Sequence, residues 1–164
     1  MSAPLWQLSH RADPKARRLA DRHYNRQSVG AVNFCPPGRA FVLWRPGAVW
    51  VTSWPFAEFT KHEWAGAWVN SLFRNESEIL SSALITAAVS HTRWKWPAPD
   101  LGMVTFVDRG KTRPKKDPGY CYLCAGFVEC GTTKKGLIAL RMSPDTMPSA
   151  SAPMHTTPDL WDRQ

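Results

Sequence analysis

The stretch Asp21–Gly30, DRHYNRQSVG, places a histidine and a tyrosine side by side where a basic segment ends before a glycine. His23 carries an imidazole that titrates near neutral pH, and Tyr24 carries a phenol, so the pair can move protons or bind a transition metal. The structural alternative is that Tyr24 closes a helix against the core while the neighbouring arginines stay in water. These residues alone leave both interpretations open.

A second chemical pattern lies at residues 72–80, where a strand-like LFRN runs directly into ESEIL, the expected start of a helix. The first amide groups of a helix lack partners within the helix and the helix dipole is positive there, which favours a bound phosphate. The candidate cofactor-binding residues are therefore Asn75, Ser77 and Glu78. Ordinary capping is the alternative, because Glu76 and Glu78 satisfy the same dipole.

The formal net charge is +8, and the basic residues are grouped, first within residues 15–26 and again in RGKTRPKK at 109–116. Grouped positive charge attracts a polyanion, and binding to nucleic acid releases counterions from the phosphates. Solubility or a phosphate-bearing cofactor would use the same charge. The residues expected to contact double-stranded DNA are Arg22, Arg26, Arg109, Lys111, Arg113, Lys115 and Lys116.

Length and composition limit the class of protein. The 164 residues suit one domain, and no apolar run approaches the roughly 20 residues of a membrane span. The N-terminal sequence turns basic and polar almost at once, so we expect a cytoplasmic protein without a membrane partner. Of the four cysteines, three form a C-x2-C-x5-C cluster. This cluster lacks the second ligand pair of a zinc site, which favours small buried thiols.

The candidate residues need elements that position them. Asp13 and Pro14 predict the start of a helix that ends near His23, and the PG between two apolar runs predicts a hairpin. Further expected elements are a strand at 67–75, a helix at 76–96, a strand at 101–108, a short helix closing on Gly126, and a hairpin at 127–142. Pro, Ser and Thr are frequent from Ser143 onward. We therefore expect a domain at 1–142 and a flexible tail at 143–164.

The short helix YCYLCAGF and the hairpin after it resemble the C-terminal half of the Gcn5-related N-acetyltransferase (GNAT) fold, where such a helix closes the acyl-coenzyme A cleft. The resemblance spans about residues 15–142 through the order of elements. It implies an α/β (α+β) single domain whose mixed, mostly antiparallel sheet is flanked by helices. The usual pyrophosphate signature is replaced here by RNESEIL, so weak or absent acetyl-CoA (acetyl-coenzyme A) binding is expected.

Within this superfamily the chain resembles phage Mom-like DNA modification proteins, which convert adenine in DNA to N6-carbamoylmethyladenine. The matching residues are the His-Tyr pair at the end of the first helix, an arginine after the third strand, an aspartate after TFV, and Tyr120 or Tyr122. The resemblance implies that the catalytic residues are His23, Tyr24, Arg74, Asp108 and Tyr120. It also implies that an iron ion is bound by His23, Tyr24, Asp108 and Tyr120.

The expected function is therefore a phage- or prophage-encoded transferase in the bacterial cytoplasm. It would modify the exocyclic amine of adenine in double-stranded DNA and protect that DNA from restriction, and it would be compatible with a homodimer. Two alternatives remain: an ordinary acyl-CoA N-acetyltransferase, and a non-catalytic DNA-binding protein that keeps a GNAT-like fold.

Overall fold

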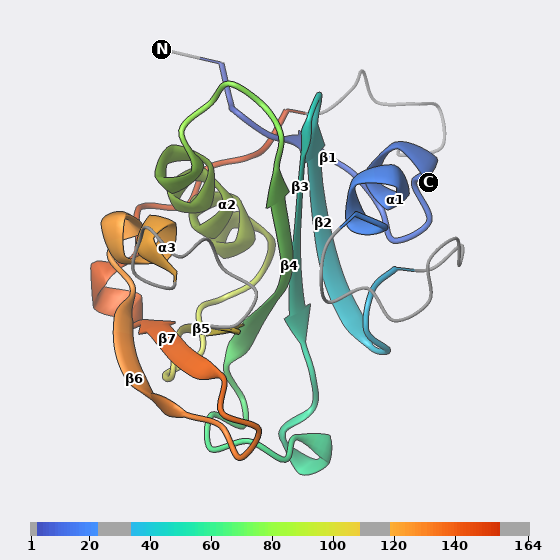
Figure 1. Cartoon of the computed structure of the whole chain (residues 1–164). Coiled ribbons are helices and arrows are strands. Elements are labelled where there is room, and N and C mark those ends of the chain that lie inside the picture. The colour runs from blue at the N-terminus through green and yellow to red at the C-terminus, as the bar shows by residue number, and fades with distance from the viewer. Residues whose placement is uncertain (1–2, 23–33, 109–118, 155–164) are drawn as a thin grey trace.

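The computed structural model describes residues 3–22, 34–108 and 119–154. Its central element is a seven-stranded sheet in the order β1-β2-β3-β4-β5-β7-β6 (Figure 1). Neighbouring strands are antiparallel except for β4 and β5, which run parallel. The structure confirms the predicted α/β domain with a mixed, mostly antiparallel sheet flanked by helices.

The elements follow one another in nearly the predicted order. The strands are β1 (Gln7–Leu8), β2 (Arg39–Arg45), β3 (Ala48–Trp54), β4 (Trp68–Asn75), β5 (Met103–Val107), β6 (Val128–Thr132) and β7 (Ile138–Met142). The helices are α1 (Pro14–Ala20), α2 (Ser81–Lys95) and α3 (Tyr120–Ala125), with short 3-10 turns η1 (Ala57–Phe59) and η3 (Pro144–Thr146). The sequence did not predict strand β1, because two residues are too few to show the alternating pattern of a strand.

Side chains that alternate along β2 and β3 supply two hydrophobic layers, one on each face of the sheet. One layer packs against α1 and consists of Ala16, Leu19, Ala20, Phe34, Val42, Val49, Val51 and Leu72. The larger layer packs against α2 and α3 and includes Phe41, Leu43, Trp50, Leu84, Ile85, Val89 and Tyr122. The sheet is therefore the middle layer of three.

Helix α1 begins as the sequence predicts. The Asp13 side chain accepts a hydrogen bond of 2.9 Å from the Lys15 amide, and Pro14 occupies the first turn. The helix ends at Ala20. His23 and Tyr24, which were expected at its end, lie outside the described residues, so their predicted positions stay untested.

Helix α2 starts later than the sequence predicts. Its first residue is Ser81 rather than a residue next to Asn75, and the capping residue Leu80 is 71% exposed. Residues 76–80 form a loop in spite of their helical apolar spacing, because polar side chains in this loop bond to one another, as described below. None of the helices in the described ranges is long and apolar enough to cross a membrane.

The first part of the predicted C-terminal tail packs against the domain. The Ser90 hydroxyl donates to the Ser149 carbonyl at 2.6 Å, and the His91 Nδ1 lies 2.8 Å from the Ser151 carbonyl oxygen. Met147 is buried in the core. Residues 143–154 therefore belong to the folded domain, because their main-chain carbonyls meet polar side chains of α2 that the sequence could not pair with them. The rest of the predicted tail, 155–164, lies outside the described residues.

Candidate functional site

The parallel strands β4 and β5 separate part of the way along the sheet. Their pairing ends at Asn70 and Thr105, although β4 continues to Asn75 and β5 to Val107. The neighbouring β3–β4 ladder shifts register at the same level, because Thr52 pairs with Asn70 while Val51 already pairs with Leu72. Bulges of this kind are common next to functional sites, where they redirect side chains.

A buried polar cluster braces the point where the two strands separate. The Tyr122 hydroxyl, brought in by α3, donates to the Asn70 Oδ1 atom. The Asn70 Nδ2 group donates to the Val51 and Leu72 carbonyls, at 3.0 Å each, and the Thr105 hydroxyl donates to the Asn70 carbonyl at 3.3 Å. These bonds satisfy polar groups that would otherwise be buried without partners.

The cluster distinguishes the two tyrosines that the sequence left open. Tyr122 is only 9% exposed and its hydroxyl is bonded within the core, whereas Tyr120 is 48% exposed at the start of α3. A group that acts on a ligand must be reachable. Tyr120 therefore remains the candidate site residue, and Tyr122 is a core residue that holds α3 on the sheet.

Asp108 and Tyr120 flank the segment between β5 and α3. Asp108 directly follows β5 and is half-buried. Gly119, just before α3, has a positive φ of 73°, and a Cβ atom there would lie 2.5 Å from the Leu140 side chain. Glycine at this position lets α3 begin close against β7. The basic residues Arg109, Lys111, Arg113, Lys115 and Lys116 fall within 109–118, outside the described residues, and so does Arg26.

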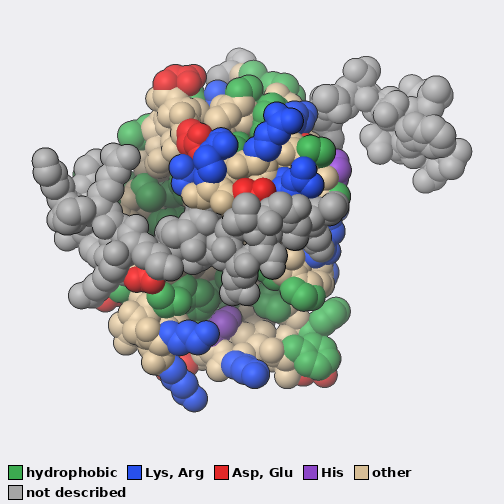
Figure 2. Space-filling model, turned by 45° about the vertical axis from the view of Figure 1, so that its right-hand side comes forward, with side chains coloured by type: hydrophobic (Ala, Val, Ile, Leu, Met, Phe, Trp, Pro, Cys, Tyr) green, Lys and Arg blue, Asp and Glu red, His purple; other side chains and the backbone are tan. Residues whose placement is uncertain are grey.

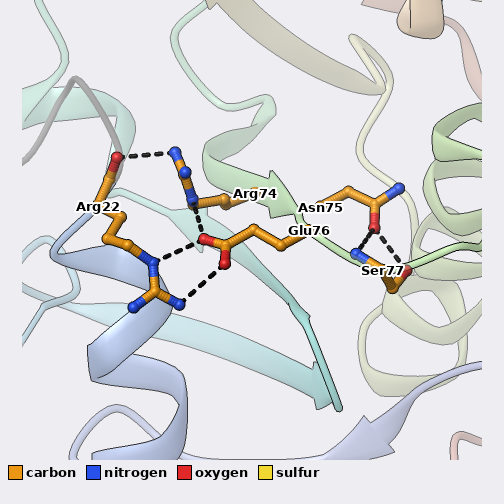
Figure 3. A network of polar contacts seen from close by, with 5 residues as sticks. All are labelled: Arg22, Arg74, Asn75, Glu76 and Ser77. Atoms are coloured by element: carbon orange, nitrogen blue, oxygen red, sulfur yellow. Dashed lines mark hydrogen bonds and ion pairs between the residues drawn. The ribbon is translucent and has the colours of Figure 1, made fainter.

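Two arginines share one carboxylate at the end of β4 (Figure 3). The Arg22 guanidinium bonds both carboxylate oxygens of Glu76, at 2.7 and 3.0 Å, and the Arg74 Nε atom donates to the same carboxylate. Arg74 also donates to the Arg22 main-chain oxygen at 2.7 Å. This arrangement ties the end of α1 to the end of β4.

These contacts shift the ionisation of Glu76. Hydrogen bonds from Arg22 and then from Arg74 lower the pKa of the Glu76 carboxyl to about 2, and the bond to Glu76 raises the pKa of Arg22. The carboxylate is therefore charged at any pH at which the protein would normally act. Arg74, predicted to hold an anion, already holds Glu76, so an external anion would compete with an internal one.

The predicted phosphate site at Asn75–Glu78 does not lie at the start of a helix. Asn75 bonds the loop internally, since its Oδ1 accepts from the Ser77 amide at 2.9 Å (Figure 3). Its Nδ2 also donates to the Ile79 carbonyl at 2.7 Å. The Glu76 amide donates to the Gly47 carbonyl at 2.6 Å. The Glu76 and Ser77 amides are therefore occupied, and residues 75–78 do not form the helix N-terminus on which the prediction for Asn75, Ser77 and Glu78 was based.

On the face shown in Figure 2, positive charge does not mark out a single track for DNA. Figure 2 shows Lys and Arg side chains in several groups, with Asp and Glu side chains among them. Arg22 is paired with Glu76, and the Lys15 ammonium lies 4.4 Å from the Trp44 ring centroid. Binding of DNA therefore stays a prediction that depends mainly on residues outside the described part.

The structure describes only part of the predicted metal site. Of the four residues expected to bind iron, Asp108 and Tyr120 are described and His23 and Tyr24 are not. Within residues 3–22, 34–108 and 119–154, no group of three or more His, Cys, Asp or Glu side chains is placed to hold a metal ion. The described residues thus offer no complete ligand set.

Sequence reasoning missed two features of this region. Asn70 is the central residue of the buried polar cluster. In the sequence it stands out only as a polar residue within an apolar strand. Glu76 is the charged centre of the arginine pair, although its position after Arg74 suggested only helix capping. Both depend on partners more than 50 residues away in the chain, Tyr122 for Asn70 and Arg22 for Glu76.

No protein-family model, curated protein or solved structure matches this chain.

Proposed function

We propose that the chain is a GNAT-like transferase that modifies the exocyclic amine of adenine in DNA, as the resemblance to Mom-like proteins implies. The separation of β4 and β5 after Asn70 and Thr105 is the observation that supports this best. Ligands of open α/β sheets bind beyond the carboxyl ends of parallel strands, where neighbouring strands diverge. β4 and β5 are the parallel pair in this sheet, and Arg74 and Asp108 lie at their carboxyl ends.

Asp108 is the proposed base. In a transfer to adenine, the N6 lone pair forms the new N–C bond, the leaving group departs from the donor with its electron pair, and one amine proton must be taken up. A carboxylate next to the amine serves this purpose, and Tyr120 is the proposed partner that protonates the leaving group or orients the base. Arg74 orients an anionic part of the donor when that part displaces Glu76.

His23 and Tyr24 complete the proposal. Arg22, the residue before His23, bonds Arg74 through its main-chain oxygen, which brings the described end of α1 to the carboxyl end of β4. This proximity is consistent with a shared site for Arg74 and the His-Tyr pair. The iron ion that the resemblance implies would be held by His23, Tyr24, Asp108 and Tyr120, and mixed nitrogen and oxygen ligands suit such an ion.

Duplex DNA would be bound through the basic residues of 109–116. Each phosphate contact contributes about 0.9 to the slope of log affinity against log salt concentration. Replacing Arg113, Lys115 and Lys116 by alanine should therefore flatten that slope. An unchanged slope in a filter-binding or anisotropy titration would remove this support.

The acyl-CoA alternative lacks a comparable observation. A pyrophosphate needs several unoccupied amides, which a glycine-rich turn or a helix N-terminus usually presents. The segment after β4 instead uses its amides on Asn75, Ser77 and Gly47. Calorimetric titration with acetyl-CoA should show weak or no binding, and micromolar affinity would favour the alternative.

Mass spectrometry of nucleosides tests the proposed activity directly. DNA from cells that express the protein should contain a modified deoxyadenosine, and Asp108→Asn should abolish it, because the amide keeps the shape of the side chain but takes up no proton. Asp145→Asn, which changes an exposed aspartate of η3, is the matched control and should retain the product. Unmodified DNA from cells with the soluble wild-type protein would contradict the proposal.

A further inference from the structure

The connection between β3 and β4 exposes two phenylalanines at the end of the sheet opposite the Arg74 site. This connection lies at the lower end of the sheet in Figure 1, and the segment after β4 lies at the upper end. Phe59 is 75% exposed and Phe56 is 53% exposed. Burying a phenylalanine stabilises a protein by roughly 1.5–3 kcal/mol, so two exposed rings on one turn have no evident role in folding.

Both rings are held in place by a hydrogen-bonded turn. The Phe59 amide and the Thr60 hydroxyl each bond the Phe56 carbonyl at 3.0 Å, and Trp54 Nε1 bonds the Gly66 carbonyl at 3.1 Å across the connection. Phe56 and Phe59 pack edge to face, with ring centroids 6.5 Å apart. The rings are therefore presented to solvent on a defined backbone, which lowers the entropic cost of binding a flat ligand.

The Arg39 side chain lies against the aromatic rings of this connection. The Arg39 guanidinium carbon lies 4.2 Å from the Trp54 ring centroid and 4.8 Å from that of Phe56, and its Nε atom donates to the Trp54 carbonyl. Among the described residues, its terminal nitrogens make no other hydrogen bond or ion pair. Arg39 is thus oriented by the rings and keeps donors for an anion.

We propose that Arg39, Trp54, Phe56 and Phe59, which together we call the aromatic tip, bind unpaired bases of single-stranded nucleic acid. A nucleotide supplies both complementary parts, a flat base for an exposed ring and a phosphate for the guanidinium. An apolar peptide would cover the rings but leave the Arg39 donors desolvated and unpaired, which is costly. The bases of a duplex are already stacked and paired, so only unpaired bases can reach the rings.

The proposal is independent of the transferase activity proposed above. The aromatic tip precedes β4, whereas Arg74 and Asp108 lie at the carboxyl ends of β4 and β5. Nucleoside analysis tests the transferase, and strand binding tests the aromatic tip, so the failure of one is distinguishable from the failure of the other.

Fluorescence anisotropy with labelled oligothymidylate tests the proposal on the full chain. Phe59→Ala should raise the Kd about 10-fold, because stacking of one base on an aromatic ring is worth roughly 1–3 kcal/mol. Phe59→Tyr should restore binding, since it keeps the ring. Leu80→Ala is the matched control, because it removes an apolar side chain of similar exposure, 71%, at the other end of β4.

An abasic strand of the same length separates stacking from charge. Basic residues elsewhere bind the phosphates of both strands, so wild-type protein should prefer oligothymidylate, and Phe59→Ala should remove that preference. Equal affinity of the wild type for both strands, or no effect of Phe59→Ala on either, would overturn the proposal. A monomer–dimer equilibrium that Phe59→Ala abolishes, without oligothymidylate binding, would also overturn it by assigning the rings to a second copy of the chain.

Discussion

At the upper end of β4, two arginines and a glutamate satisfy one another, and the Glu76 carboxylate receives three hydrogen bonds (Figure 3). At the lower end, Arg39 lies on aromatic rings, and its terminal nitrogens have no partner among the described residues. At the upper end of β4 the charged groups are therefore paired with one another. At its lower end a cation and aromatic rings are exposed to solvent. An exposed arginine indicates binding only when its donors remain available.

The largest expected effect concerns Asn70, which lies between the two ends and fixes the path of β4. Asn70→Leu keeps the side-chain size but removes the partners of the Tyr122 hydroxyl and of the Val51 and Leu72 carbonyls. We expect the free energy of unfolding to fall by about 3 kcal/mol, measured by urea denaturation. Tyr122→Phe, which removes one hydroxyl, should cost about 1 kcal/mol. Equal losses for the two variants would show that the cluster does not depend on Asn70.

The next largest effect is expected when the pairing of Glu76 with Arg22 and Arg74 is broken. Glu76→Gln removes the charge that neutralises Arg22 and Arg74, so both guanidinium groups become available to phosphates. The salt dependence of duplex DNA binding should steepen by about 0.9 for each phosphate newly contacted. Glu58→Gln, in the turn between the two exposed phenylalanines, is the control for a change of one charge. An identical slope for both variants would mean that the upper end does not face DNA.

The same variant should change the response to acid. Because the pKa of Glu76 is lowered to about 2, its pairing stabilises the fold fully above the unfolded value of about 4.3. That contribution is lost as the pH falls from about 4.3 to about 2. Denaturation at several pH values should show a difference between wild type and Glu76→Gln at pH 6 that narrows across this window. A constant difference would contradict the ionised pair.

The smallest expected effect is on the stability of the aromatic tip. Phe56→Ala and Phe59→Ala remove exposed rings, so each should change the free energy of unfolding by less than about 0.5 kcal/mol. Thermal denaturation of both variants checks this. A loss of several kcal/mol would show that the rings serve packing, and reduced strand binding could then not be attributed to stacking.

Local chemistry made much of the fold predictable from the sequence. Asp13 and Pro14 start α1, the PG turn joins β2 and β3, and Gly126 ends α3 in a left-handed conformation, all as predicted. Each of these signals acts within a few residues. These local signals therefore predict helix ends and turns without knowledge of contacts elsewhere in the chain.

The candidate site was less predictable, because local side-chain bonds overrode the apolar spacing and because other contacts join residues far apart in the chain. Apolar spacing at Ile79 and Leu80 suggested a helix from 76, but Asn75 bonds Ile79 and Ser81 and delays the helix to Ser81. The partner of Glu76 is Arg22, and no local pattern reports such a pairing. Likewise, the bond that Tyr122 donates from α3 to Asn70, where the pairing of β4 and β5 ends, has no local signal in the sequence.

Met154 forms a bridge with Gln7 on the outer side of β1, where its carbonyl accepts from the Leu8 amide at 2.9 Å and its amide donates to the Trp6 carbonyl at 2.8 Å. During synthesis on the ribosome, β1 emerges before the other strands of the sheet, but the residue that covers its free edge emerges after all of them. Until then the nascent chain carries an uncovered strand edge, which is a template for association with other chains. The edge of β1 is therefore covered only after residue 154 has emerged, and a chaperone that shields β1 would act before that point.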